Sequence, residues 1–108
     1  MIISILKINP LHGKRQEILD TLRSVKGHVL ASPGCLACSI YEENGEEQGL
    51  LYLEQWRSLP DLERHVRNSS YSRIMAAMEL SASVPEIFFH ETGETWGFEL
   101  IERVRTGH

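Results

Sequence analysis

The segment from Tyr52 to Val66 constrains the fold most strongly, because it changes from a strand pattern to a helix pattern within two residues. The strand pattern ends at Arg57. Ser58 is a good N-cap, since its hydroxyl can accept a hydrogen bond from an otherwise unpaired amide of the first turn. Pro60 is tolerated early in a helix because its missing N–H would have no partner there. The sequence therefore predicts a strand followed at once by a helix.

The predicted helix carries a histidine beside its apolar stripe. Leu62, His65 and Val66 stand at positions i, i+3 and i+4, so they share one helix face. That face must pack back over the sheet. An imidazole titrates near neutrality, which suits a general base, and we take His65 as the candidate catalytic residue. The alternative is a helix-flank histidine that only hydrogen-bonds a neighbour.

Length and charge narrow the function classes. The chain has 108 residues, which predicts one domain spanning 1–108. Its formal net charge of −4 argues against nucleic-acid binding, because phosphate contacts need a basic surface. The apolar run at residues 1–8 is too short for a membrane span or an export signal. We therefore expect a cytoplasmic protein that binds neither nucleic acid nor membrane.

Cys35 and Cys38 form a C-x-x-C motif. A redox pair needs its first cysteine at a helix N-terminus, whereas Cys35 opens a predicted strand. Residues i and i+3 of a regular strand point to opposite faces. The sequence offers no second cysteine pair to complete a zinc site. We expect buried, unbridged thiols and no metal; a redox or zinc site is the alternative.

Periodicity and turn signals divide the rest of the chain. All four prolines fall at or just inside a predicted boundary, which supports the division. The polar connection 43–49 carries the Asn-Gly signal of a hairpin. The predicted elements are strand 2–8, helix 14–31, strand 35–43, strand 50–57, the helix after Ser58, helix 71–80, strand 87–90 and a C-terminal strand at about 97–105, with a tail at 106–108.

This order predicts an α+β fold, the ferredoxin-like split βαβ plan with an antiparallel sheet. Helices in this plan cover one face of the sheet, so the other face should be polar. It is not: Leu50 and Tyr52 on one face oppose Leu51 and Leu53 on the other. Both faces need burial. A second copy of the sheet is the simplest cover, which predicts a two-fold homodimer.

Several motifs resemble those of one known family. They are Pro33-Gly34-Cys35, Leu53-Glu54-Gln55-Trp56-Arg57-Ser58, His65 nine residues after the tryptophan, Met78-Glu79-Leu80-Ser81, Pro85-Glu86-Ile87 and Glu99-Leu100-Ile101-Glu102. Together they resemble the antibiotic biosynthesis monooxygenase (ABM) domain, over nearly the whole chain. The resemblance implies a dimeric α+β barrel, in which two ferredoxin-like subunits join through their sheets.

The resemblance also implies an activity. Better-understood relatives oxidise quinol-like or polycyclic phenolic substrates with O₂, without a metal, flavin or other cofactor. A deprotonated hydroquinone can pass an electron to O₂ itself, so the protein need only take the proton, hold the ring and exclude water. The haem-degrading branch has a tryptophan and an axial histidine where this chain has His65 and Met75. Haem oxygenation is therefore set aside.

One predicted strand supplies three candidate pocket residues. Tyr52 and Trp56 share a strand face with Glu54 between them. A buried Glu54 carboxylate could be a second proton acceptor. The alternative, which we favour, is a strand-end glutamate paired with an arginine.

Four further residues are candidate pocket residues. Tyr71, Met75 and Met78 share a predicted helix face and could line an apolar ligand pocket, although such a stripe is more often core. His90 on the last predicted strand but one could reach the pocket or the partner subunit.

Two functions of different classes follow from these residues. One is a cofactor-independent monooxygenase that oxidises a small quinol or phenol with O₂, with His65 as base. The other is a non-catalytic dimer that binds a small hydrophobic metabolite. A sealed pocket with His65 and a second polar group would favour the enzyme, and a core filled by Met75, Met78 and Phe89 would favour the binding module.

Overall fold

A four-stranded antiparallel sheet forms the centre of the fold. The computed structural model describes residues 1–45 and 48–107, and in it the strands lie in the order β2-β3-β1-β4. Their bounds are β1 (Ile2–Ile8), β2 (Cys35–Glu42), β3 (Leu50–Trp56) and β4 (Glu86–Glu91). The predicted strands 2–8, 35–43, 50–57 and 87–90 are thus confirmed to within a residue or two.

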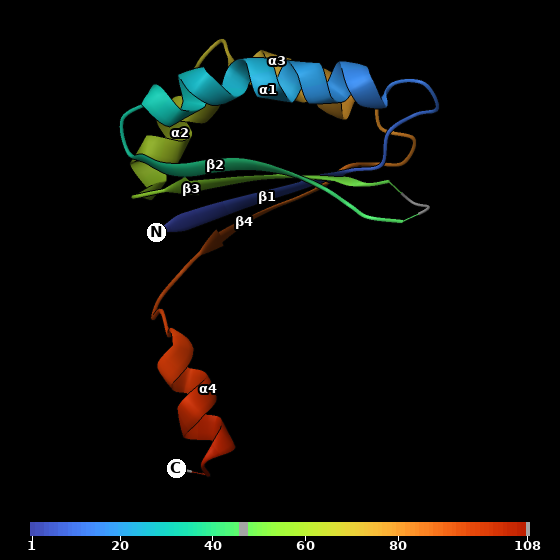
Figure 1. The fold of residues 1–108 in the computed structure, drawn as a ribbon. Helices are drawn as coiled ribbons and strands as arrows, with labels where there is room; N and C mark the ends of the chain where they lie inside the picture. Colours follow the sequence, from blue (N-terminus) through green and yellow to red (C-terminus); the bar gives the residue numbers. More distant parts are fainter. Residues whose placement is uncertain (46–47, 108) are drawn as a thin grey trace.

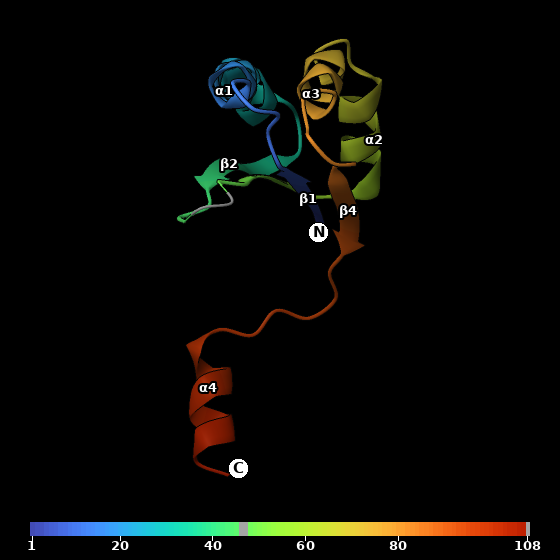
Figure 2. The same cartoon turned by 90° about the vertical axis from the view of Figure 1, so that its right-hand side faces the viewer.

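Three helices cover one face of this sheet (Figure 1). They are α1 (Arg15–Ala31), α2 (Leu59–Arg67) and α3 (Tyr71–Met78). Viewed along the strands, α1 lies over the β2 side and α2 and α3 lie over the β4 side (Figure 2). The predicted ferredoxin-like α+β fold is confirmed.

The core lies between the sheet and these helices. In β1 and in β3, buried and half-buried residues alternate, because successive side chains point to opposite faces. α1 presents an apolar stripe of helical period to the same layer. The buried apolar residues are Ile2, Leu6, Ile8, Ile18, Leu19, Leu22, Val25, Val29, Cys38, Leu50, Tyr52, Trp56, Leu62, Tyr71, Ile74 and Ala77.

The opposite face, here called the outer face, has no helix over it in the described part of the chain. Ile5 stands between Leu53 and Phe88 on neighbouring strands, so these three side chains share the outer face. Tyr41 and Leu51 are likewise paired there, and Phe88 and Tyr41 are each more than half exposed. The outer face is therefore an apolar surface open to solvent.

The predicted start of α2 at Ser58 is confirmed. The Ser58 hydroxyl accepts a hydrogen bond from the Asp61 amide at 3.4 Å and donates one to the Asp61 carboxylate at 2.7 Å. Just beneath, Gly34 adopts a left-handed backbone with φ of 83°, and its carbonyl accepts from the Arg57 amide at 2.8 Å. This hydrogen bond joins the turn before β2 to the residue before the α2 cap.

The predicted C-terminal strand at 97–105 is wrong, because Phe98–Arg105 forms a helix, α4. Phe98, Ile101 and Val104 recur every three residues, which is a helical spacing. The Gly97 amide donates to the Glu99 carboxylate at 2.8 Å, which occupies one amide at the helix start. α4 projects away from the rest of the chain on the outer-face side (Figure 1). Of the predicted tail 106–108, position 108 lies outside the described residues.

The two cysteines lie on the same face, not on opposite faces. Cys35 pairs with Trp56 and Cys38 pairs with Glu54, and the register shifts between Cys35 and Ala37. This β-bulge inserts one extra residue into β2, which interrupts the alternation of side chains and brings Cys35 and Cys38 onto the same face. Both cysteines are free thiols; Cys38 is buried as predicted, but Cys35 is only half-buried.

The predicted hairpin joins β2 to β3. The Glu43 amide donates to the Gly49 carbonyl at 2.8 Å, and positions 46–47 lie outside the described residues.

Substitution of Gly34 tests the close contact between the turn before β2 and the start of α2. A Cβ added at this position would lie 2.2 Å from the Asp61 carboxyl carbon, and the positive φ is strained for any other residue. We expect Gly34→Ala to lower the free energy of unfolding by roughly 1–3 kcal/mol, measured by urea denaturation. Gly27→Ala is the control, because α1 leaves open space there and alanine favours a helix. Equal effects of the two substitutions would contradict this account.

Candidate functional site

A buried carboxyl group, Glu54, lies at the centre of the candidate site. Its side chain is 1% exposed. The Tyr52 hydroxyl donates to Oε2 at 2.6 Å, the Trp56 indole N–H donates to Oε1 at 3.0 Å, and His65 Nε2 lies 2.9 Å from Oε2. β3 supplies Tyr52, Glu54 and Trp56 at alternate positions, and α2 brings His65 across them. The favoured pairing of Glu54 with an arginine is therefore wrong.

The partners of Glu54 favour one tautomer of His65. The indole N–H can only donate. The Cys38 thiol donates to the Tyr52 oxygen at 3.3 Å, so the tyrosine proton is free to go to Glu54. Glu54 thus accepts on both oxygens. A carboxylate can only accept, so opposite a Glu54 carboxylate His65 Nε2 is the donor, and the lone pair of the neutral imidazole is then on Nδ1.

Two aromatic rings hold the His65 imidazole. The Trp56 ring stacks on it with centroids 4.7 Å apart and planes at 27°. The Tyr71 ring meets it edge-on, with centroids 5.1 Å apart and planes at 88°. The His65 side chain is 1% exposed, and Nδ1 has no hydrogen-bond partner among the described residues. The imidazole is thus fixed in place with a basic nitrogen that no described group occupies.

Burial changes the acidity of the neighbouring groups. Burial, with the Glu54 carboxylate second, raises the pKa of Tyr71 to about 12. The same two causes raise the pKa of Tyr52 far above its usual range. Burial also raises the pKa of the Cys38 thiol to about 11. These groups therefore remain protonated donors at neutral pH, and Cys38 is a poor nucleophile because thiolates are the reactive form.

Asp61, at the start of α2, is a second buried carboxylate. It accepts from Ser58, and its other oxygen accepts from Arg64 Nη1 at 3.0 Å. Arg57 Nε lies 3.5 Å from the carboxylate. The Ser58 hydrogen bond, followed by Arg64 and Arg57, lowers the pKa of Asp61. This cluster fixes the first turn of α2 and so the height of His65 above the sheet.

The structure brings together only part of the predicted site. Tyr71 is buried against His65. Met75 is more than half exposed, and together with the half-buried Met78 it lines an apolar groove of about 320 Å³ against Ile87 on β4. His90 lies on the outer face, stacked on Phe88 with centroids 6.0 Å apart. His90 and His65 are therefore on opposite faces of the sheet.

The cavity beside His65 is small. Its lining comes from α2, Trp56 and the turn before β2, and it encloses about 50 Å³. An apolar cavity of roughly 150 Å³ is needed to hold benzene. No cavity of aromatic size is thus seen beside His65 in the described part of the chain. The closed site has room beside the buried imidazole and carboxyl group for less than an aromatic ring.

Sequence reasoning missed two members of this site. Cys38 was treated only as a buried thiol, because the bulge that aims it at Tyr52 leaves no clear sequence signal. Asp61 does have a sequence signal, because the Ser58-x-x-Asp61 spacing places a carboxylate near the helix cap. Among residues 1–45 and 48–107, no group of three or more His, Cys, Asp or Glu side chains could hold a metal ion.

Comparison with known proteins places the chain in a family. Residues 1–77 match the family model described as "Antibiotic biosynthesis monooxygenase". The chain belongs to the ABM family. That match spans β1 through nearly all of α3 and so includes every residue of the Glu54–His65 cluster.

Relatives of known structure share the ABM fold. A conserved protein of Methanosarcina mazei is 24% identical, covers 85% of this chain and 92% of its own, and superposes with a TM-score of 0.78. A Deinococcus radiodurans protein named for the ABM family is 20% identical, covers 91% and 98%, and has a TM-score of 0.80. At these identities the likeness concerns the fold alone.

A curated relative is longer than this ABM chain. An uncharacterised Synechocystis protein is 25% identical over 91 residues, which cover 83% of this chain. The chain spans about 60% of the length of that relative. In the described residues, no helix is both long and apolar enough to cross a membrane. The cellular location stays a prediction.

Asp61 predicts an acid dependence of stability. Because the native pKa is lowered, the stabilisation is present above the unfolded-state pKa and is lost as the pH falls through the native one. We expect the melting temperature to decrease as the pH is lowered below about 4, which is the ordinary pKa of an aspartate. In Asp61→Asn this decrease should be less steep. Glu63→Gln, an exposed change on the same helix, is the control and should keep the wild-type profile. Identical profiles for wild type and Asp61→Asn would contradict the assignment.

Proposed function

We propose that this chain is a cofactor-independent monooxygenase that oxidises a small quinol or phenol with O₂, with His65 as general base. The observation that carries the proposal is the buried contact of 2.9 Å between His65 Nε2 and Glu54 inside an ABM fold. A carboxyl group on one imidazole nitrogen stabilises the protonated ring and aims the other nitrogen at a proton donor. Such a sealed pair favours catalysis over core filling.

The chemistry balances without an added reductant. Nδ1 of His65 takes a phenolic proton, and the electron-rich phenolate passes electrons to O₂. One oxygen atom then bonds to a ring carbon and the other leaves as water. A hydroquinone and O₂ give a hydroxyquinone and water, so the ring supplies every electron that O₂ accepts. Exclusion of water protects the oxygen intermediates from side reactions.

Access to the buried base requires movement of α2. The cavity at His65 encloses about 50 Å³, which is too small for an aromatic ring. A displacement of α2 away from the turn at Ser32 and Pro33 would widen this cavity while His65 stays against Trp56 and Glu54. Trp56, which lines the cavity, would then stack on a flat substrate. Met75, Met78 and His90 lie outside this space.

A second candidate is a non-catalytic module that binds a small hydrophobic metabolite. The observation in its favour is that the open apolar groove lies at Met75, Met78 and Ile87, apart from His65. Against it, Met75 and Phe89 are exposed and so do not fill the core. A metabolite bound in that groove would not need the buried Glu54–His65 pair.

The active form in this proposal is a two-fold dimer joined through the outer faces. Ile5, Leu53 and Phe88 lie together on that face, and Phe88 is 55% exposed. Stacked sheets pack about 10 Å apart and bury such side chains against each other. Dimerisation would therefore remove an apolar surface from water.

His65→Gln tests the catalytic assignment. The glutamine amide can still donate to Glu54, but it cannot accept a proton. We expect the fold to be retained while O₂ uptake with an active hydroquinone falls by roughly 10²- to 10⁴-fold, the usual contribution of a positioned general base. The measurement is oxygen consumption across a panel of hydroquinones and catechols.

The matched control is His28→Gln, an exposed histidine on α1, which should leave oxygen uptake unchanged. Uptake at the wild-type rate in His65→Gln would make His65 structural. If no hydroquinone or catechol is oxidised by the wild type, but one binds at the Met75 groove, the second candidate is correct.

A further inference from the structure

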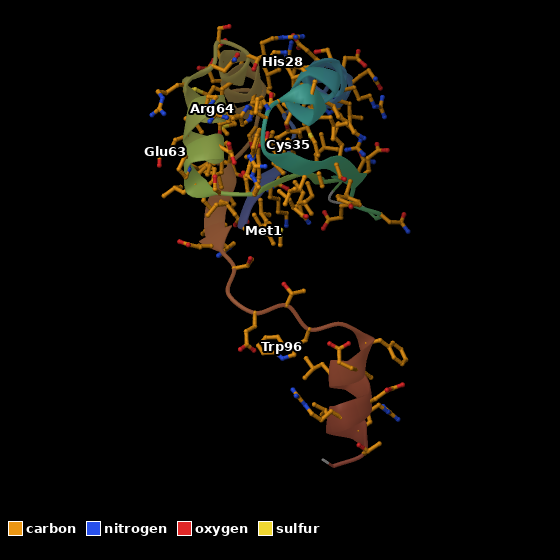
Figure 3. All side chains as sticks on the ribbon, turned by 90° about the vertical axis from the view of Figure 1, so that its left-hand side faces the viewer. Met1, His28, Cys35, Glu63, Arg64 and Trp96 are labelled. Atoms are coloured by element: carbon orange, nitrogen blue, oxygen red, sulfur yellow. The ribbon has the colours of Figure 1, made fainter. Side chains whose placement is uncertain are left out.

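The C-terminal helix α4 carries an apolar stripe with nothing packed against it in the described chain. Phe98 is 71% exposed, Val104 is 68% exposed and Ile101 is 52% exposed. These residues recur at helical spacing, while Glu99 and Glu102 lie on the other side of the helix. Trp96 lies in the segment that leads to α4, well away from the sheet and the other helices (Figure 3). A helix of this length is marginal in water by itself, so the stripe needs a partner.

An apolar groove on the body of the domain also lacks a cover. It lies between α2 and β4, is lined by Leu59, Leu62, Val66 and Phe89, and encloses about 340 Å³. Leu59, Val66 and Phe89 are each between 40% and 50% exposed. We call this the α2–β4 groove. It offers α4 a surface of matching chemistry.

The arrangement of the chain separates α4 from the groove of its own copy. The segment after β4 crosses beneath the sheet from the β4 side towards the β2 side, and α4 then lies on the outer-face side (Figure 2). The α2–β4 groove belongs to the helix side. In this structure the two surfaces are therefore on opposite sides of one sheet.

A second copy brings the two surfaces together. If two outer faces stack about a two-fold axis parallel to the strands, the order of the strands is reversed between the copies. The β4 edge and α2 of the second copy then lie beneath the β2 edge of the first, which is where α4 descends. The reciprocal contact follows from the symmetry.

We propose that α4 is an exchanged arm, whose Phe98, Ile101 and Val104 pack into the α2–β4 groove of a second copy. This inference rests on the proposed two-fold dimer and not on the proposed turnover. The groove is lined by Leu59, Leu62 and Val66 of α2, the helix that also carries His65. The arm of one copy therefore restrains the helix that must move to open the site of the other.

Isotope-filtered NMR on the full chain tests this contact. Dimers are formed from ¹³C-labelled and unlabelled chains, and nuclear Overhauser effects are recorded only between them. We expect cross-peaks that join Ile101 and Val104 of one chain to Val66 of the other. If α4 contacts appear only within one chain, the arm folds back onto its own copy, and the exchange is wrong.

A double-mutant cycle gives a second test. The wild type should have a light-scattering mass of twice the 12.3 kDa of one chain. Ile101→Asp and Val66→Asp change exposed residues and should leave the domain folded. Each should raise the dimer Kd by about 10- to 100-fold, and the double variant should be no worse than the more damaging single one, because both remove one contact.

Arg103→Gln, on the polar side of α4, is the matched control and should leave the Kd unchanged. Additive effects of the two aspartates, or a single-chain mass for the wild type, would overturn the exchanged arm. The readouts do not depend on turnover. A dimer with the expected coupling but no oxygen uptake would therefore contradict the proposed activity and leave the arm standing.

Discussion

The buried Glu54 carboxyl group is the constraint on which the candidate site depends. A carboxyl group removed from water is costly unless hydrogen bonds replace its hydration. Tyr52, Trp56 and His65 supply those bonds, and the first two come from the same strand face as Glu54. Because the buried Glu54 needs all three partners, these hydrogen bonds fix how α2 crosses β3. The polar cluster thus specifies where the helix sits, and the apolar core around it supplies the burial.

A second constraint is that the sheet is apolar on both faces. Three helices cover one face, and the other leaves Ile5, Leu53 and Phe88 in contact with solvent. The proposed dimer would bury the outer face, and it would also give α4 a surface to pack on, which α4 lacks among the described residues of its own copy. In this account the closed site, the mobile α2 and the exchanged arm belong to one arrangement. Opening of one site would be coupled to the contact made by the other copy.

The sequence predicted what depends on short-range patterns. Alternation along Tyr52–Trp56 and the cap at Ser58 placed β3, α2 and the inward direction of His65. The predicted arginine partner of Glu54 was wrong, because the true partner depends on how α2 crosses β3. The cysteines were placed on opposite faces because a bulge changes the register without a sequence signal. The prediction for the last element was wrong because Leu100 and Ile101 fit a strand as well as a helix, whereas the spacing of Phe98, Ile101 and Val104 is helical.

The proton position on His65 is the most direct test of the central claim. With ¹⁵N-labelled histidine in the full chain, two-bond ¹⁵N–¹H spectra at a pH that keeps the ring neutral distinguish the two tautomers. The account predicts a single Nε2–H form for His65 in the wild type, because Nε2 lies 2.9 Å from Glu54 and a carboxylate there can only accept, and it predicts loss of that preference in Glu54→Gln. An Nδ1–H form in the wild type, or a mixture like that of the exposed His28, would contradict it.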